Sequence, residues 1–208
     1  MYTPAAFRFD ELAEQHAAIV AIGFATLVVH DADGFAAVPL PVTLDPAAGP
    51  LGTLRAHVAR ANPIWKRLDG AAALLIVQGP HGYVSPDWYE TPLQVPTWNY
   101  LTLHLHGTVR LLDAAGTRQM LVDLSAVHEA RLLPKTPWTL DKMPETAVDG
   151  LQRAIVGLEI PLDRIEGKAK LSQNRKEVDR AGVVAGLKGR PDGDPGSREL
   201  AALMERLG

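Results

Sequence analysis

The chain has 208 residues, with 21 Lys or Arg, 24 Asp or Glu and a formal net charge of −3. This length fits one domain with an appendage or two small domains, and the ordinary composition allows a sizeable core. The net charge argues against a generally basic nucleic-acid binder. The absence of cysteine excludes disulfides, thiolate catalysis and zinc–thiolate or iron–sulfur sites.

The first residues, MYTPAAFRFDELAEQH, lack the basic start and the apolar run of a signal peptide. No uninterrupted apolar run in the chain approaches the length of a transmembrane helix. We therefore expect a soluble, cytoplasmic protein with no membrane partner.

The first part of the chain predicts a helix followed by strands. The helix starts at Asp10, in DELAEQHAAIV, where apolar residues follow helical spacing. FATLVVH and FAAVPLPVTL flank the turn residues DADG, which indicates a hairpin. Pro39 and Pro41 cannot donate to a sheet ladder, so the second strand should lie at an edge or be irregular. LGTLRAHVARANPIWKRL predicts a short strand and then a helix, and AAALLIVQG predicts an apolar strand.

Further along, NYLTLHLHGTVRLLD predicts a long strand with leucines on one side and Thr102, His104 and His106 on the other. TRQMLVDLSAVHEARL predicts an amphipathic helix, KTPWTLDKMPE a connection and AIVGLEIPLDRIEGK another strand. After the loop RPDGDPGS, SRELAALMERL predicts a closing helix. The fold class is therefore mainly β (α+β), an antiparallel barrel with helices at its margins. We expect a single domain over residues 1–208, with a C-terminal basic segment and closing helix, residues 164–208, as an appendage.

The stretch AHVARANPIWK places donors and positive charge around a short helix, on His57, Arg60 and Lys66. Free amides at a helix start and a nearby guanidinium both suit a phosphate group. The alternative interpretation is a solvated basic helix face.

The segment Gly79 to Tyr100 holds five tyrosines and tryptophans and four of the sixteen prolines. Aromatic side chains can stack on a planar ring, and prolines would hold them in place. This pattern predicts the wall of a site for a flat, anionic cofactor. A hydrophobic plug or a dimer contact is the alternative, because Trp and Tyr also favour interfaces.

A charged segment near the C-terminus, residues 164–180, carries six positive and three negative side chains. If it is extended, Lys168, Lys170, Ser172 and Asn174 share one face, which could hold a phosphate or reach across a subunit boundary. A solvated charged segment is the alternative.

Two histidines at spacing i, i+2, His104 and His106, could bind a metal together with His57 or His81. No acidic residue lies in that strand, so a polar pair facing the barrel is favoured and we assign no metal site. No nucleophile elbow and no carboxylate pair stands out, so no catalytic residue is assigned.

Four motifs in this order, ARANPIW, GPHGYVSPDWY, VPTWNYLTLHLHG and GKAKLSQN, resemble the PaiB-type branch of the FMN-binding split-barrel proteins. The resemblance runs from Met1 to about Met204 and also includes MYTPAAF and IVGLEI. It departs from the usual pattern at AAVPLPV, where many relatives carry a histidine.

The resemblance implies a split β-barrel with flanking helices, a homodimer and FMN bound near the subunit interface. It also implies a negative transcriptional regulator. For the phosphate the candidates are His57, Arg60 and Lys66, with Lys168, Lys170 and Ser172 as a competing set. For the flavin ring and the wall of its site the candidates are Trp88, Tyr89, Thr97, Trp98 and Asn99.

Other functions stay open on the sequence alone. A flavin- or haem-dependent redox enzyme of the same fold is the alternative, with His104 and His106 as haem ligands or donors, so whether the chain is an enzyme is undecided. No pair of helices with a basic second helix is apparent, so direct binding of DNA has little physical support.

Overall fold

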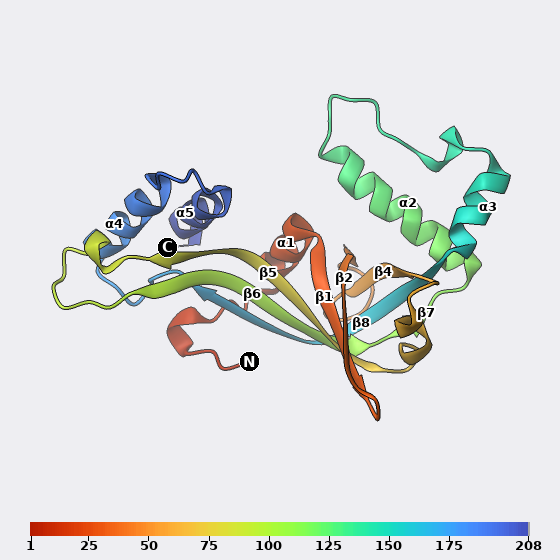
Figure 1. Cartoon of the computed structure of the whole chain (residues 1–208), viewed down its shortest axis with the longest axis horizontal. Coiled ribbons are helices and arrows are strands. Elements are labelled where there is room, and N and C mark those ends of the chain that lie inside the picture. The colour runs from red at the N-terminus through yellow and green to blue at the C-terminus, as the bar shows by residue number, and fades with distance from the viewer. Residues whose placement is uncertain (208) are drawn as a thin grey trace. The chain divides into compact units, whose positions relative to one another are not determined.

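The computed structural model of the chain describes residues 1–207 and has the following elements (Figure 1). The α-helices are α1 (Leu12–Ile22), α2 (Ala114–Ala130), α3 (Glu145–Arg153), α4 (Glu177–Lys188) and α5 (Pro195–Leu207). The strands are β1 (Phe24–Asp31), β2 (Gly34–Pro41), β3 (Thr43–Asp45), β4 (Thr53–Ala59), β5 (Ala72–Val84), β6 (Thr97–Thr108), β7 (Arg110–Leu111) and β8 (Ile155–Lys170). Short 3-10 helices are η1 (Ala5–Phe7), η2 (Pro63–Arg67), η3 (Pro86–Trp88) and η4 (Leu140–Lys142).

The contacts divide the chain into two compact units. The barrel unit comprises His16–Val77 and His104–Ile165, and the terminal unit comprises Met1–Gln15, Gln78–Leu103 and Glu166–Gly208. Strands β5, β6 and β8 contribute residues to both units. The prediction of one domain with an appendage from residue 164 stays a prediction.

The sheet has the strand order β2-β1-β5-β6-β8-β4-β3, with β7 paired to β8. The prediction of a mainly β, antiparallel fold with helices is confirmed. Strand β2 lies at one end of this order, as its two prolines predict, because proline has no N–H for a second neighbour. The turn before β2 uses Gly34 at φ +91°, a conformation that glycine adopts without strain.

The strand order explains why the barrel unit closes. Strands β2 and β3 stand at opposite ends of the order, yet only Val42 separates them along the chain. The two ends of the sheet are therefore brought together, as barrel closure requires. Fully buried aliphatic side chains fill this unit, among them Leu27, Leu54, Leu75, Leu105, Leu158 and Ile160.

In the terminal unit, one face of the strands is covered by helices α4 and α5, which lie side by side (Figure 1). Residues of β6 alternate between buried and partly exposed, as the leucine pattern predicts. A Cβ at Gly82 of β5 would lie 3.1 Å from Leu200 of α5, so the helices pack closely on this face. Leu187, Leu200 and Met204 are fully buried there.

Helix α4 was not expected from the sequence, where residues 177–180 belong to the charged segment and residues 181–188 have no predicted element. The structure shows the reason for its small side chains: a Cβ at Gly186 would lie 2.3 Å from the ring of Trp88, and one at Gly182 would lie 2.0 Å from the Trp88 carbonyl oxygen. Helix α3 was also missed, and the helix expected within residues 51–68 is the 3-10 helix η2.

The connection after Trp88 is held by Asp179 of α4, whose side chain is buried. Its carboxylate accepts hydrogen bonds from the amides of Glu90 and Thr91, both at 2.9 Å, and from the Thr91 hydroxyl at 2.7 Å. The Thr91 hydroxyl and these amides lower the pKa of Asp179. Asp179 therefore fixes the start of the connection that leads to β6.

Within residues 1–207, no helix is both long and apolar enough to cross a membrane.

Candidate functional site

The candidate residues fall into different units. His57, Arg60 and Lys66 lie in the barrel unit. The remaining eight lie in the terminal unit: Trp88, Tyr89, Thr97, Trp98, Asn99, Lys168, Lys170 and Ser172.

In the barrel unit, the residues His57, Arg60 and Lys66 offer little positive charge that is available to a phosphate. The Arg60 guanidinium donates to the carbonyl oxygens of Arg153 at 2.8 Å and Ile155 at 3.0 Å. His57 lies on β4, where burial lowers the pKa of its imidazole, and its buried Nδ1 atom has no hydrogen-bond partner among the described residues. A neutral His57 would give a phosphate a hydrogen bond but no charge. Lys66 is exposed on η2.

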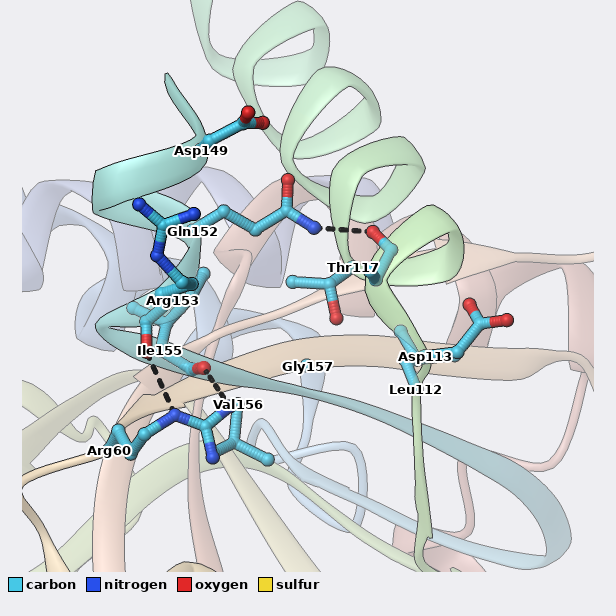
Figure 2. A pocket seen from close by; sticks show the side chains of 11 residues that line it. Arg60, Leu112, Asp113, Thr117, Asp149, Gln152, Arg153, Ile155, Val156 and Gly157 are labelled. Atoms are coloured by element: carbon cyan, nitrogen blue, oxygen red, sulfur yellow. Dashed lines mark hydrogen bonds between the residues drawn. The ribbon is translucent and has the colours of Figure 1, made fainter. Parts of the chain in front are cut away.

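A pocket of about 240 Å³ lies beside Arg60 in the barrel unit (Figure 2). Its lining residues come from α2, α3, β8 and the segments next to them: Arg60, Leu112, Asp113, Ala114, Thr117, Asp149, Gln152, Arg153, Ile155, Val156 and Gly157. None of these side chains is aromatic, and the carboxylates of Asp113 and Asp149 would repel a phosphate. The pocket is therefore poorly suited to a flavin nucleotide.

In the terminal unit, the aromatic stretch serves two purposes. Trp88 packs on the glycines of α4, and Tyr89 lies under the Arg175 guanidinium, which is 5.2 Å from the ring centroid. The Tyr89 hydroxyl is buried without a hydrogen-bond partner among the described residues. Trp98, in contrast, is 53% exposed. Trp88 and Tyr89 thus hold the connection in place, while Trp98 is available to a ligand.

Asn99 and Ser172 form a buried polar pair. The Asn99 amide donates to the Ser172 hydroxyl at 2.9 Å and to the sulfur of Met204 at 3.5 Å. Ser172 has φ +63°, an unusual conformation for a residue with a side chain. Since each polar group already has a partner, this pair is better suited to fixing the ends of β6 and β8 than to holding a ligand.

An open hollow of about 330 Å³ lies in the terminal unit and is lined by Gln78, His81, Trp98, Tyr100, Leu101 and Thr102. The Trp98 ring stacks on His81 with centroids 6.3 Å apart and meets Tyr83 edge-on at 6.2 Å. This volume lies at the lower end of the roughly 300–1,000 Å³ typical of ligand sites. The hollow therefore offers a planar group an aromatic surface with polar atoms beside it.

Lys168 lies over the ring of Tyr100, which lines this hollow, and Lys170 interacts electrostatically with Tyr100, Lys168 and Arg175. The Lys168 ammonium lies 5.5 Å from the ring centroid of Tyr100 and donates to the Tyr2 carbonyl oxygen at 3.1 Å. Lys170 donates to the Thr97 hydroxyl, and Arg175 donates to the side-chain carbonyl of Gln94. Within residues 1–207, none of the three pairs with a carboxylate. Such a group has charge to offer to an anion.

The electrostatics of Lys170 fit this arrangement. Burial lowers the pKa of its ammonium, the neighbouring charges of Lys168 and Arg175 lower it further, and Tyr100 opposes them. An anion placed among these cations would relieve their mutual repulsion.

We name this surface, made of His81, Tyr83, Trp98, Tyr100, Lys168, Lys170 and Arg175, the aromatic–basic face. Sequence reasoning named Trp98 and the two lysines but not the other four residues as site residues. The sequence could have predicted Tyr100 as a site residue, because it alternates with Trp98 and Thr102 along one strand and so shares their face. No local sequence pattern predicts His81 or Arg175 as site residues, because their positions depend on contacts between distant parts of the chain.

Residues 1–164 match the family described as "Putative FMN-binding domain", and the chain belongs to this family. Two solved structures have a similar fold. The FAD and heme binding protein from Mycobacterium smegmatis has a TM-score of 0.56 at 17% identity, over 81% of this chain and 76% of that one. The flavocytochrome Anf3 from Azotobacter vinelandii has a TM-score of 0.54 at 16% identity, over 84% of this chain and 73% of that one.

Among relatives in sequence, Protease synthase and sporulation protein PAI 2 from Bacillus subtilis is 32% identical over 150 residues, which cover 72% of this chain and 70% of the relative. The PaiB-type resemblance is thereby confirmed. An uncharacterized protein of Emericella nidulans is 31% identical over 166 residues, which cover 65% of this chain and 66% of the relative. The chain thus spans about two thirds of the length of these relatives. The family match supports the prediction of FMN as the cofactor.

Proposed function

We propose that the chain binds FMN on the aromatic–basic face, with Trp98 and Tyr100 against the flavin ring and Lys168 and Lys170 at the phosphate. The observation that carries this proposal is the Lys168 ammonium, 5.5 Å from the centroid of Tyr100, a ring that lines the aromatic hollow. A planar surface and charge without carboxylate partners are what a flat anionic cofactor requires.

The charges of the basic side chains on this face also fit FMN. Lys168, Lys170 and Arg175 are cations whose contacts within residues 1–207 are to neutral groups, so a phosphate would have charge to bind. When bound, the flavin would supply the capacity to accept and donate electrons. The protein residues orient the ring and neutralise the phosphate, and Asp179 holds the connection between Trp88 and β6 that leads to Trp98.

We expect purified protein to quench the fluorescence of FMN saturably, at one flavin per chain. Trp98→Leu removes the exposed aromatic surface and should weaken binding about tenfold, since stacking contributes roughly 1–3 kcal/mol per ring. Trp138→Leu is the matched control, because Trp138 lies in the barrel unit between α2 and α3 and should leave the affinity unchanged. Absence of quenching at saturating FMN would refute the proposal.

The lowered pKa of Lys170 predicts a pH dependence. The protonated ammonium binds the phosphate, so affinity is full below the pKa of Lys170 and falls as pH rises through it. Because this pKa is lowered, FMN binding should weaken over a range of pH that lies below the ordinary lysine pKa of about 10.4. In Lys170→Arg the guanidinium stays charged over this range, so a fluorescence titration should show a smaller loss. Equal losses in both proteins would contradict this role of Lys170.

The finer role we propose is negative transcriptional regulation, by a cytoplasmic homodimer. Its support is the sequence similarity to the PaiB type and the name of the Bacillus relative, which refers to protease synthesis and sporulation. Fully exposed Leu93 and largely exposed Val95, on the connection between η3 and β6, are apolar side chains that a second copy would cover. Light scattering tests the dimer. A gel shift with the upstream DNA of the native operon separates direct DNA binding from action through a partner.

A redox enzyme that uses flavin or haem is the second candidate. Of the two structural neighbours, one is named an FAD and heme binding protein and the other a flavocytochrome. In this chain, however, the His106 ring nitrogen lies 3.1 Å from the Arg164 guanidinium. A cation at this distance competes with a metal for the imidazole lone pair, so we favour FMN over haem. A Soret band on addition of haem, lost on replacing His104 or His106, would reverse this preference.

A further inference from the structure

In the terminal unit, helices α4 and α5 cover one face of the strands and leave aromatic rings exposed on the other (Figure 1). Gly82 of β5 faces α5, and its neighbours His81 and Tyr83 are both exposed. On β6, Asn99 is buried against α5, and its neighbour Trp98 is exposed. Because neighbouring residues of a strand point to opposite faces, these three rings lie on the face that α5 does not cover.

The rings on this face come from neighbouring strands and contact one another. The Trp98 ring of β6 meets both His81 and Tyr83 of β5. Two residues further along β6, Tyr100 points to the same side as Trp98. The face therefore offers stacking surface at more than one point along the strands.

Positive charge lies beside these rings on β8, the other neighbour of β6. The Lys168 ammonium is 5.5 Å from the ring centroid of Tyr100 and 5.7 Å from that of Tyr2, whose side chain is 84% exposed. Lys170 points to the same side as Lys168. Arg8 is exposed and stands opposite Lys168 in an antiparallel bridge, so it also points to this side. Among the described residues, none of these three cations pairs with a carboxylate.

A flavin in the hollow does not account for all of these groups. The hollow is lined by Trp98 and Tyr100, but Tyr2, Arg8 and Tyr83 are not among its lining residues. Rings and positive charge thus continue beyond the space of one flavin nucleotide. Such a surface suits a ligand in which flat groups and phosphates repeat along a chain.

We propose that the aromatic–basic face, together with Tyr2 and Arg8, binds single-stranded nucleic acid. Bases would stack on the exposed rings, and backbone phosphates would lie beside Lys168, Lys170 and Arg8. Stacking platforms next to a basic surface are the usual means of binding single strands without sequence preference. The bases of a duplex are stacked on one another and cannot reach the rings, so a duplex should bind weakly. This activity goes beyond FMN binding and does not require it, but the two ligands would compete for Trp98.

The test is fluorescence anisotropy of labelled oligothymidylate and oligouridylate of about ten nucleotides, titrated with the full chain. We expect saturable binding of at least one, and the comparison of the two distinguishes DNA from RNA as the ligand. The double variant Tyr2→Leu and Arg8→Gln should bind the oligonucleotide at least tenfold more weakly, since stacking alone contributes roughly 1–3 kcal/mol per base. Its FMN affinity should be unchanged. Phe35→Leu with Arg110→Gln, at exposed positions of the barrel unit, is the matched control.

The salt dependence gives a second measurement. Lys168→Gln and Lys170→Gln should each reduce the slope of log affinity against log salt by about 0.7, the contribution of one phosphate contact on a single strand. Three outcomes would overturn the proposal: neither oligonucleotide binds, a duplex of the same length binds equally well, or the Tyr2 and Arg8 variant binds as the wild type does. Fluorescence titration of FMN is a separate measurement on the same proteins, so failure here is distinguishable from failure of the flavin proposal.

Discussion

Replacing Lys168 and Lys170 together by glutamine should weaken FMN binding at least a hundredfold and leave riboflavin binding nearly unchanged. Each lysine would give the phosphate a charge-assisted hydrogen bond, and such bonds are worth about 1.5–3 kcal/mol each. Riboflavin has no phosphate, so its affinity depends on the aromatic surface around Trp98 alone. Fluorescence titrations of both flavins against the wild type and the double variant measure the two effects separately.

The control for this experiment is the double variant Arg60→Gln and Lys66→Gln, which removes two cations from the barrel unit. It also decides between the two sets of residues predicted to bind the phosphate, because both sets contain positively charged side chains. We expect it to bind FMN as the wild type does. A large loss in this variant, with none in the Lys168 and Lys170 variant, would place the phosphate at His57, Arg60 and Lys66 instead.

Gly186→Ala should destabilise the protein by about 1–3 kcal/mol, the usual cost of overpacking a closely packed contact. The new Cβ would lie 2.3 Å from the Cδ2 atom of Trp88 and 2.4 Å from its Cε2 atom. Helix α4 or the indole must therefore move, which also disturbs the connection that Asp179 holds. Since a chain of this size loses about 2–4 °C per kcal/mol, the melting temperature should fall by roughly 2–12 °C.

Gly150→Ala on α3 is the matched control for the glycine change. The nearest atom to its new Cβ is 4.0 Å away, so alanine should fit and should stabilise the helix by up to about 1 kcal/mol. Adding Trp88→Ala to Gly186→Ala removes the clash and should cost less than the sum of the two single changes. If Gly186→Ala melts at the wild-type temperature, the close contact between α4 and Trp88 is wrong.

Much of the fold could be predicted because it depends on local patterns. The alternation along β6 and the prolines of β2 each report how one strand meets its neighbours. Helix α4 could not be found in this way, because its buried side faces Trp88, about ninety residues away in the sequence. Its glycines at 182 and 186 lower helix propensity, and the Trp88 carbonyl oxygen against Gly182 and the Trp88 indole against Gly186 explain their presence.

The sequence predicted the types of residue in the candidate site better than it predicted the particular residues. Aromatic and basic residues were both expected; Trp98 lines the hollow, and Lys168 and Lys170 interact with Tyr100, which lines it as well. Trp88 and Trp98 belong to the same aromatic stretch of the sequence, but Trp88 packs against α4. The sequence could not distinguish the two rings, because it does not show which of them a helix covers. Arg60 likewise has the charge of a phosphate ligand, but its guanidinium is bonded to two backbone carbonyls.

A crystal structure of the protein soaked with FMN would test the central claim most directly. We predict density for the flavin ring against Trp98 and Tyr100 and density for the phosphate beside Lys168 and Lys170. Density for the phosphate beside His57, Arg60 and Lys66, with none on the aromatic–basic face, would contradict the account.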